Sequence, residues 1–192
     1  MEKAERSLSQ ITFGYAATAI SSVLSTGFWP GWMTGVPGKG GGTAGSLVGL
    51  LVQLALLEYA WQVPAAIAIA TFAIGLAVVG PAERFMLAIW GPRLKHVGHE
   101  KVREDFNETC FDEFHAVFVY DAFFRLFPMT QEEHLALLFA GFVIFRVLDA
   151  KKPWPIGWIE RRWHGTAFGI MVDDTVAAAI TAGLLGFYFF LR

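Results

Sequence analysis

Long apolar segments alternate with short polar ones along most of this chain. Apolar runs occupy residues 44–60, 64–82, 111–127, 134–148 and 175–191. The first two, joined by a tight turn at 61–64, are each near the lower limit of the ~17–25 residues that a spanning helix needs. A short polar turn at 128–133 joins the third run to the fourth. The pattern predicts an all-α fold, a polytopic membrane bundle of about five spanning helices that forms one domain over residues 1–192.

A further apolar segment at residues 11–33 is less regular, because it is rich in Ser, Thr and Gly and is broken around Pro30. It either spans the membrane or dips into it without crossing. Lys and Arg are dense in the N-terminus, at 83–110 and at 150–164, and are absent from the two tight turns. By the positive-inside rule, a dipping segment places every basic stretch on the cytoplasmic side, so dipping is the favoured interpretation.

Composition supports a membrane location and excludes several classes of protein. Of the 192 residues, 55% are hydrophobic and only 17% are charged, whereas soluble domains average roughly 25% charged residues. The formal net charge of −2 and the lack of a basic, aromatic-rich face argue against nucleic-acid binding. A single cysteine, Cys110, excludes a disulfide framework, and we expect it to pack in the protein interior. The N-terminus lacks the apolar core and cleavage site of a removable signal peptide.

Acidic side chains gather at the predicted cytoplasmic ends of the helices. Asp105, Glu108 and Asp112 have spacings of three and four, which would place them on one side of a helix. The other acids of this group are Glu113, Asp149, Asp173 and Asp174. So many like charges cannot sit together in ionised form without a cation. Carboxylate oxygens without a cysteine cluster favour a hard ion, Mg²⁺ before Ca²⁺ or Mn²⁺.

Some of these acids also have a purely structural alternative. Asp149 would then pair with Arg146 or Lys152. Asp173 or Asp174 would cap the N-terminus of the last helix, where the helix dipole favours a carboxylate. Adjacent helical residues point about 100° apart, so one member of such a pair can cap the helix while the other binds a metal.

Groups suited to anion binding lie close to the acids in this topology. The glycine-rich stretch 36–46 leads into a helix start at about Thr43, where free backbone N–H groups offer a phosphate seat. Side chains able to hold phosphate oxygens are Lys39, Arg146, Lys152 and His164. Carboxylate-bound metal together with cationic groups suits phosphoryl chemistry. The location at a membrane face indicates a lipid headgroup as the substrate.

Three blocks of sequence resemble the signature of the phosphatidylglycerophosphatase A family. They are AGFVIFRVLDAKKPWPI at 140–156, HG at 164–165 and GIMVDD at 169–174. The pattern D-x-x-E-x-x-x-D-E at 105–113 and GTAGSL at 42–47 are also similar to that family. The resemblance implies a magnesium-dependent, all-helical membrane phosphatase that converts phosphatidylglycerophosphate to phosphatidylglycerol and phosphate in phospholipid biosynthesis. It further implies a multi-pass protein of the bacterial cytoplasmic (inner) membrane with its active site facing the cytoplasm.

The motifs and the resemblance together assign expected roles. The expected catalytic residues are Asp112, Asp149, Asp173 and His164. The expected substrate-binding residues are Lys39, Thr43, Gly45, Ser46, Arg146 and Lys152. The expected ligands of the cofactor, Mg²⁺, are Asp105, Glu108, Asp112, Asp149, Asp173 and Asp174. The expected partner is a phospholipid substrate in the membrane and not a nucleic acid, and the sequence leaves the oligomeric state open.

Other functions are also compatible with the sequence. They are a phosphatase for another lipid phosphomonoester, a membrane ion or phosphate transporter, and an inert scaffold for lipid synthesis. A transporter would carry charges at mid-bilayer depth, whereas here the charges gather at helix ends. The chain shows no Ser–His–acid or Cys–His signature, which favours direct attack by water over a covalent enzyme intermediate.

Overall fold

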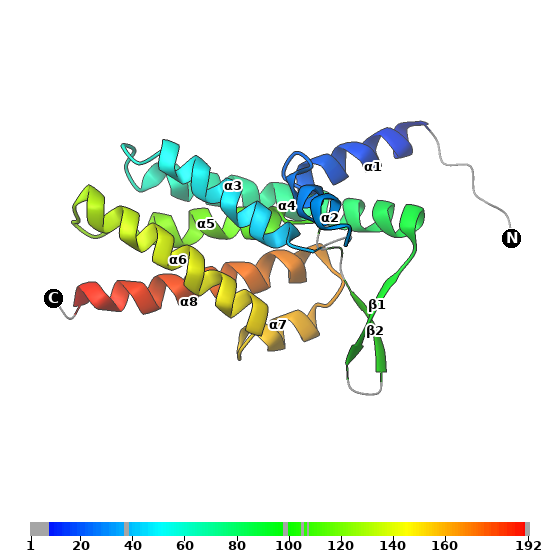
Figure 1. The fold of residues 1–192 in the computed structure, drawn as a ribbon. Helices are drawn as coiled ribbons and strands as arrows, with labels where there is room; N and C mark the ends of the chain where they lie inside the picture. The colour runs from blue at the N-terminus through cyan, green and yellow to red at the C-terminus, as the bar shows by residue number, and fades with distance from the viewer. Residues whose placement is uncertain (1–7, 37–38, 98–99, 105, 107, 191–192) are drawn as a thin grey trace, which may run out of the picture.

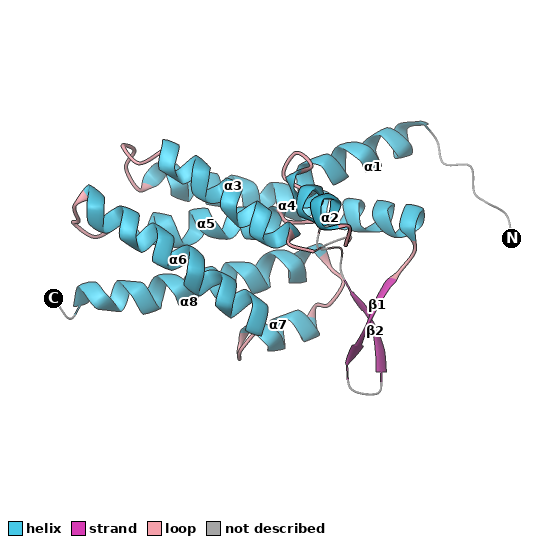
Figure 2. Ribbon diagram, in the orientation of Figure 1, coloured by secondary structure: helices cyan, strands magenta, loops and turns pink. Residues whose placement is uncertain are grey.

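Helices form most of the chain in this computed structural model, which describes residues 8–36, 39–97, 100–104, 106 and 108–190 (Figures 1 and 2). The α-helices are α1 (Leu8–Ser21), α2 (Trp29–Thr34), α3 (Gly41–Ala55), α4 (Gln62–Trp90), α5 (Phe111–Phe124), α6 (Gln131–Lys151), α7 (Ile156–Arg162) and α8 (Ala167–Phe190). A short 3-10 helix, η1 (Thr26–Phe28), precedes α2, and two strands, β1 (Arg93–Val97) and β2 (Glu100–Glu104), follow α4. The expected helical fold class is thereby confirmed.

Helix α5 lies at the centre of the bundle, where it contacts α3, α4, α6 and α8. Its sequence explains this position, because FHAVFVYDAFF is apolar on nearly every side. A helix without a polar face is stable when it is buried among other elements. The side chains of Val117, Phe118, Tyr120 and Phe124 are accordingly fully buried.

Close packing of α3 against α5 depends on small residues. A Cβ atom at Gly45 would overlap the backbone oxygen of Cys110, and one at Gly49 would lie 2.9 Å from the backbone oxygen of Phe114. In lipid, helices associate largely through such close backbone approach. Glycine at these positions therefore brings the start of α3 directly against the start of α5.

Helix α4 is longer than the apolar run at 64–82 predicted. It continues past Pro81 to Trp90. The added turns are stabilised by packing, since Ala82 and Met86 are buried in a cluster with Ala17 of α1.

Helix α8 begins earlier than the apolar run at 175–191 predicted. It starts at Ala167, and the Thr166 hydroxyl accepts a hydrogen bond from the Gly169 amide at 3.0 Å. Asp173 and Asp174 therefore lie inside the helix. The alternative in which one of them caps its N-terminus is wrong, because Thr166 supplies the cap.

The N-terminal apolar segment is broken, as its composition indicated. Helix α1 ends at Ser21, and Val23, Leu24 and Ser25 adopt positive φ angles of 49°, 54° and 71°. With 14 residues, α1 is about 21 Å long at 1.5 Å per residue. Whether this segment dips into the membrane or crosses it stays a prediction.

The strands β1 and β2 were not expected from the sequence. They pair in antiparallel fashion, with Arg93 opposite Glu104, and project from the bundle beyond the end of α4 (Figure 2). Both strands are rich in charged residues, which suits a hairpin outside an apolar bundle. The polar stretch at 83–110 is thus the end of a helix followed by a hairpin.

Two of the described helices are long and apolar enough to cross a membrane, over Gln62–Trp90 and Ala167–Phe187. Helix α3 is apolar but has only 15 residues. By length and composition, the structure supports two spanning helices, and the expected number of about five is not confirmed.

Candidate active site

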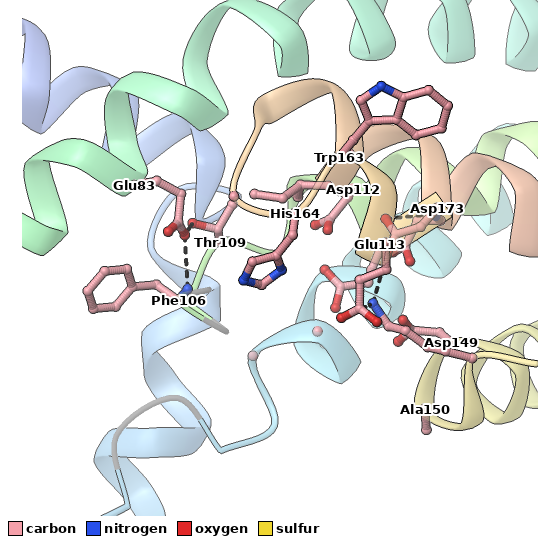
Figure 3. Close-up of a pocket in the computed structure, with 18 of the residues that line it drawn as sticks. Glu83, Phe106, Thr109, Asp112, Glu113, Asp149, Ala150, Trp163, His164 and Asp173 are labelled. Atoms are coloured by element: carbon pink, nitrogen blue, oxygen red, sulfur yellow. Dashed lines mark hydrogen bonds and ion pairs between the residues drawn. The ribbon is translucent and has the colours of Figure 1, made fainter. Parts of the chain in front are cut away.

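A polar cavity of about 290 Å³ lies where the first turns of α3 and α5 meet the end of α6, helix α7 and the first half of α8 (Figure 3). Seven of its lining side chains are carboxylates, and its lining holds two permanent cations, Arg146 and Lys152. The acids are Glu83, Asp112, Glu113, Asp149, Glu160, Asp173 and Asp174. The helix ends thus gather negative charge around one hollow.

Three of these acids form an inner cluster. Asp112 and Glu113 lie in the first turn of α5 and Asp174 lies on α8, with one oxygen of each carboxylate within 4.8 Å of the others. Asp112 Oδ1, Glu113 Oε2 and Asp174 Oδ2 are buried, and each has no hydrogen-bond partner among the described residues. Buried anionic oxygens this close repel each other unless a cation or a proton lies between them. Three unpaired carboxylate oxygens are a donor set that fits a hard divalent cation such as Mg²⁺.

A glycine makes room for this cluster at the start of α3. A Cβ atom at Gly42 would overlap Glu113 Oε1. The backbone of Gly40, Gly41 and Gly42 instead lines the cavity. The first amides of a helix have no acceptor within the helix and form the positive end of its dipole, so α3 presents an anion-binding end to the cavity.

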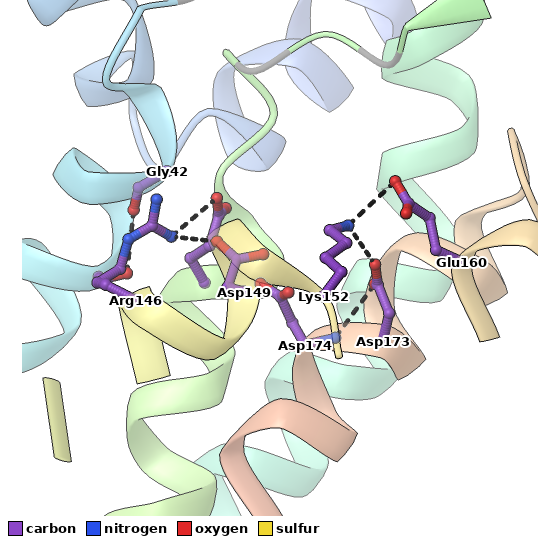
Figure 4. Close-up of polar contacts among 9 residues, drawn as sticks. Gly42, Arg146, Asp149, Lys152, Glu160, Asp173 and Asp174 are labelled. Atoms are coloured by element: carbon purple, nitrogen blue, oxygen red, sulfur yellow. Dashed lines mark hydrogen bonds and ion pairs between the residues drawn. The ribbon is translucent and has the colours of Figure 1, made fainter. Parts of the chain in front are cut away.

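Arg146 is held by acids from two helices (Figure 4). Its Nη1 donates to Asp149 Oδ2 at 2.7 Å and to Glu113 Oε1 at 3.4 Å. The first contact is local to the last turns of α6, and the second ties α6 to α5. The arginine side chain is still 23% exposed, so an incoming anion can reach it.

Lys152 follows the last residue of α6 in a left-handed conformation, with φ of 43°. Its Nζ donates to Asp173 Oδ2 at 2.7 Å and lies 3.2 Å from Glu160 Oε1 (Figure 4). Burial by itself lowers the pKa of Lys152, but the carboxylates of Asp173 and Asp174 outweigh that effect and raise the pKa above its ordinary value. Lys152 is therefore a permanent positive charge beside the inner cluster.

Comparison with known proteins decides the family of the chain. A family model described as phosphatidylglycerophosphatase A matches residues 19–189. The chain belongs to the phosphatidylglycerophosphatase A family. The resemblance seen in the sequence blocks is thereby confirmed.

Two relatives in the phosphatidylglycerophosphatase A family show how the similarity is distributed. Phosphatidylglycerophosphatase A of Escherichia coli (strain K12) is 62% identical over 48 residues, which is 25% of this chain and 27% of that protein. Phosphatidylglycerophosphatase A of Haemophilus influenzae (strain ATCC 51907 / DSM 11121 / KW20 / Rd) is 28% identical over 156 residues, 81% of this chain and 80% of that protein. No solved structure matches the chain at a comparable level of significance.

The cavity brings together most of the side chains expected from the phosphatidylglycerophosphatase A motifs. Those that line it are Asp112, Asp149, Asp173, Asp174, Arg146, Lys152 and His164. They come from α5, α6, α8 and the connections that follow α6 and α7. The imidazole of His164 projects into the space between Glu83 and Glu113 (Figure 3).

Four expected substrate-binding residues do not line the cavity. They are Lys39, Thr43, Gly45 and Ser46. Lys39 and Thr43 are exposed, whereas Gly45 and Ser46 are buried inside α3. The reason is that α3 begins at Gly41, before the expected start at Thr43. The part of α3 that lines the cavity is therefore formed by the glycines that precede Thr43.

Glu108, expected as a metal ligand, also lies away from the acidic cluster. Its carboxylate accepts two hydrogen bonds from Arg93, at 2.6 and 2.7 Å. It was expected to share a helix side with Asp112, but α5 begins only at Phe111, so helical spacing does not apply to it. Asp105, the other acid of that motif, lies outside the described residues.

Three acids that line the cavity, Glu83, Glu113 and Glu160, had no expected role as site residues. Glu83 is buried, and its Oε1 accepts hydrogen bonds from the Phe106 amide at 2.9 Å and the Thr109 hydroxyl at 3.2 Å (Figure 3). A carboxylate that directly follows an apolar run is costly in a membrane, and that signal would have identified Glu83. No comparable signal marked Glu160, because its role depends on the turn that brings α7 towards Lys152.

Cys110 is fully buried immediately before α5. Burial and the nearby carboxylate of Glu113 raise the pKa of its thiol above the ordinary value. The thiolate is the reactive form of cysteine, so this environment suppresses its reactivity. The observation agrees with the expected packing role.

Proposed function

We propose that the chain hydrolyses phosphatidylglycerophosphate to phosphatidylglycerol and inorganic phosphate, as a Mg²⁺-dependent step of phospholipid biosynthesis. Membership of the family supports a phosphoric monoester hydrolase, and both relatives carry the name phosphatidylglycerophosphatase A. One observation carries the proposal: three buried carboxylate oxygens, unpaired within the described residues, share a cavity with Arg146 and Lys152.

We place this cavity at the cytoplasmic headgroup level of the inner membrane. From Gln62 to Glu83, helix α4 is about 33 Å long, close to the ~30 Å thickness of the apolar core. Helices α5 and α8 contact α4, and α3 and α6 pack against α5, which supports a bundle of five spanning helices (Figure 1). Exposed apolar side chains along them would face lipid, among them Leu51, Ile69, Phe139, Val143 and Leu184.

The inner cluster would hold the metal. Asp112, Glu113 and Asp174 supply the unpaired oxygens, and Asp149 and Asp173 lie beside them on the cavity wall. When bound, Mg²⁺ would neutralise charge on the phosphate oxygens and lower the pKa of a bound water. The all-oxygen character of the cluster supports this ion over softer metals.

The chain's own cations would bind the phosphate. Arg146 and Lys152 are oriented by carboxylates that keep them charged, and the first amides of α3 add neutral donors. During hydrolysis a bond forms between phosphorus and the water oxygen, while the bond from phosphorus to the glycerol oxygen breaks. Asp149 or Asp173, whichever is not committed to the metal, would accept the water proton, and His164 would donate a proton to the departing glycerol oxygen.

Phosphate release from phosphatidylglycerophosphate by purified protein in nanodiscs tests the proposal. Release should require Mg²⁺, stop in EDTA, and fall by about 10²-fold or more in Asp173→Asn and Asp174→Asn. Glu132→Gln is the matched control, because Glu132 is an exposed acid in the first turn of α6, at the far end of that helix from Arg146 and Asp149. Thermal unfolding confirms that each variant is folded. Release that is unaffected by EDTA would contradict the metal assignment, and equal rates on phosphatidic acid would identify a general lipid phosphomonoesterase.

A further inference from the structure

Arg162 and Trp163 border the opening of the acidic cavity, where α7 ends. Trp163 lines the cavity, and so do the next two residues, His164 and Gly165 (Figure 3). His164 and Gly165 are exposed, so the cavity opens to its surroundings at this point. The guanidinium of Arg162 lies over the Trp163 ring, 5.8 Å from the ring centroid. We refer to Arg162 and Trp163 as the mouth pair.

Arg162 is a cation that the protein itself does not neutralise. Its side chain is exposed, and it forms no ion pair with any residue that the structure describes. Inside the cavity, by contrast, Arg146 and Lys152 are each held by a carboxylate at 2.7 Å. The contact with the Trp163 ring holds the guanidinium of Arg162 beside the opening. Its N–H donors can therefore bind an anion that reaches the mouth of the cavity.

The mouth pair lies at the depth of the lipid headgroups. A Cβ atom at Gly80 of α4 would lie 3.6 Å from Cβ of Ala167, the first residue of α8. Gly80 is less than one helical turn before Glu83, where we place the cytoplasmic end of the apolar core. Ala167 in turn follows Trp163 after three residues. The mouth of the cavity is therefore level with the boundary between acyl chains and headgroups.

Two exposed aromatic side chains continue the mouth pair along the protein surface. The Trp158 ring lies 5.9 Å from the Trp163 ring, and the Phe168 ring lies 5.4 Å from it. Trp158 is 50% exposed and Phe168 is 44% exposed. Exposed aromatic groups of this kind are typical of the boundary between headgroups and acyl chains. A lipid can therefore place its headgroup in the cavity while its acyl chains stay in the membrane beside these rings.

We propose that Arg162 binds the phosphodiester of a lipid headgroup whose terminal phosphomonoester lies in the acidic cavity. This inference rests on the proposed function and adds to it the residue that selects a headgroup with two phosphates. Charge complementarity supports it, because a phosphodiester is a permanent anion and Arg162 is a permanent cation.

The position of the cavity's own lysine agrees with a headgroup that extends between two cations. Lys152 Nζ lies 3.2 Å from Glu160 Oε1, and Arg162 follows Glu160 by two residues in the last turn of α7. Lys152 and Arg162 therefore flank the same part of the cavity wall, one inside it and one at its mouth. Phosphatidic acid has a phosphomonoester but no phosphodiester, so Arg162 discriminates it from phosphatidylglycerophosphate.

Kinetics on two lipids test the role of Arg162. In nanodiscs, Arg162→Gln should raise KM for phosphatidylglycerophosphate by about tenfold, the effect expected for loss of one charge-assisted hydrogen bond. KM for phosphatidic acid and kcat for both lipids should stay near the parent values. Arg162→Lys, which keeps the charge, should recover part of the loss.

Arg161→Gln is the matched control for these kinetics. Arg161 is also exposed, and its substitution removes the same charge about 100° around the helix from Arg162. Thermal unfolding confirms that each variant is folded. The proposal is contradicted by an unchanged KM in Arg162→Gln, by an equal rise for both lipids, or by an equal effect of Arg161→Gln. The last two results would indicate a general effect of surface charge.

A binding experiment distinguishes failure of this inference from failure of the proposed function. With Mg²⁺ present, the parent chain in nanodiscs should bind a non-hydrolysable phosphonate analogue of phosphatidylglycerophosphate more tightly than the corresponding analogue of phosphatidic acid. Arg162→Gln should abolish that difference. Selective binding by protein that releases no phosphate would support the role of Arg162 and reject the hydrolysis. Active protein that binds both analogues equally would reject the role of Arg162 alone.

Discussion

Neutralising Asp174 should stabilise the protein when divalent cations are absent. The cause is repulsion within the inner cluster, where carboxylate oxygens lie within 4.8 Å of one another. At that separation and an effective dielectric constant of about 20, two unit charges repel by about 3.5 kcal/mol. Asp174 faces two such partners, Asp112 and Glu113, although proton uptake by the cluster and the charge of Lys152 offset part of the repulsion. We expect Asp174→Asn to raise the free energy of unfolding in EDTA by about 1–3 kcal/mol.

The same substitution should remove stabilisation by Mg²⁺. In the parent chain, Mg²⁺ at about 100 times its Kd should add about 2.7 kcal/mol to the free energy of unfolding. Asparagine supplies one neutral carbonyl oxygen in place of a carboxylate, so the ion binds more weakly and this increment is lost. Asp174→Asn is therefore expected to be more stable than the parent in EDTA and less stable than the parent in Mg²⁺.

Thermal unfolding followed by tryptophan fluorescence, with and without Mg²⁺, measures both effects. Glu132→Gln controls for a general change in net charge, because Glu132 is exposed at the start of α6. The reasoning is refuted if Asp174→Asn unfolds at a lower temperature than the parent in EDTA and retains the Mg²⁺ shift. That result would mean that the three carboxylates of the inner cluster share protons and have a structural role in place of binding a cation.

Three further variants or probes test other parts of the site. Arg146→Ala should lower kcat/KM for phosphatidylglycerophosphate by about 10²–10³-fold, with the Mg²⁺ shift of unfolding retained. Gly42→Ala should destabilise the fold by about 1–3 kcal/mol because its Cβ overlaps Glu113 Oε1, whereas Gly183→Ala, which has open space, should not. Cys110 should react slowly with a maleimide even at about pH 9, because its raised pKa keeps the thiolate fraction low at that pH; mass spectrometry should show rapid labelling only after unfolding.

Local patterns in the sequence were enough to locate most of the site. Arg146, Asp149 and Lys152 are three residues apart at the end of one apolar run, so the sequence placed them at the same helix end and predicted their pairing as an alternative to a metal role. Asp173 and Asp174 were identified by their position beside an apolar run and by the family motif. Such residues are predictable because their neighbours in space are their neighbours in the chain.

Tertiary structure decided the remainder. The spacing of Glu108 and Asp112 suggests a shared helix side only if one helix contains both, and the chain from 108 to 110 is not helical. Glu83 reaches the cavity because α4 continues beyond its apolar run, and Glu160 reaches it because α7 folds back towards α6. A sequence pattern cannot report these juxtapositions, since each depends on where a helix starts, ends or turns.

The charge balance of the cavity should make phosphate binding depend on a divalent cation. Seven lining carboxylates oppose two permanent cations, and both cations are already engaged by acids at 2.7 Å. The excess negative charge of the cavity repels a phosphomonoester dianion that approaches it. Salt screens this repulsion only weakly, because the Debye length of ~8 Å at physiological ionic strength exceeds the spacing of the charges. Positive charge at the inner cluster would reverse the local field and free Arg146 from Glu113. Calorimetry should therefore detect inorganic phosphate only with Mg²⁺ present, and phosphate should tighten Mg²⁺ binding by the same factor. Equal phosphate affinity in EDTA and in Mg²⁺ would show that Arg146 and Lys152 suffice without a metal.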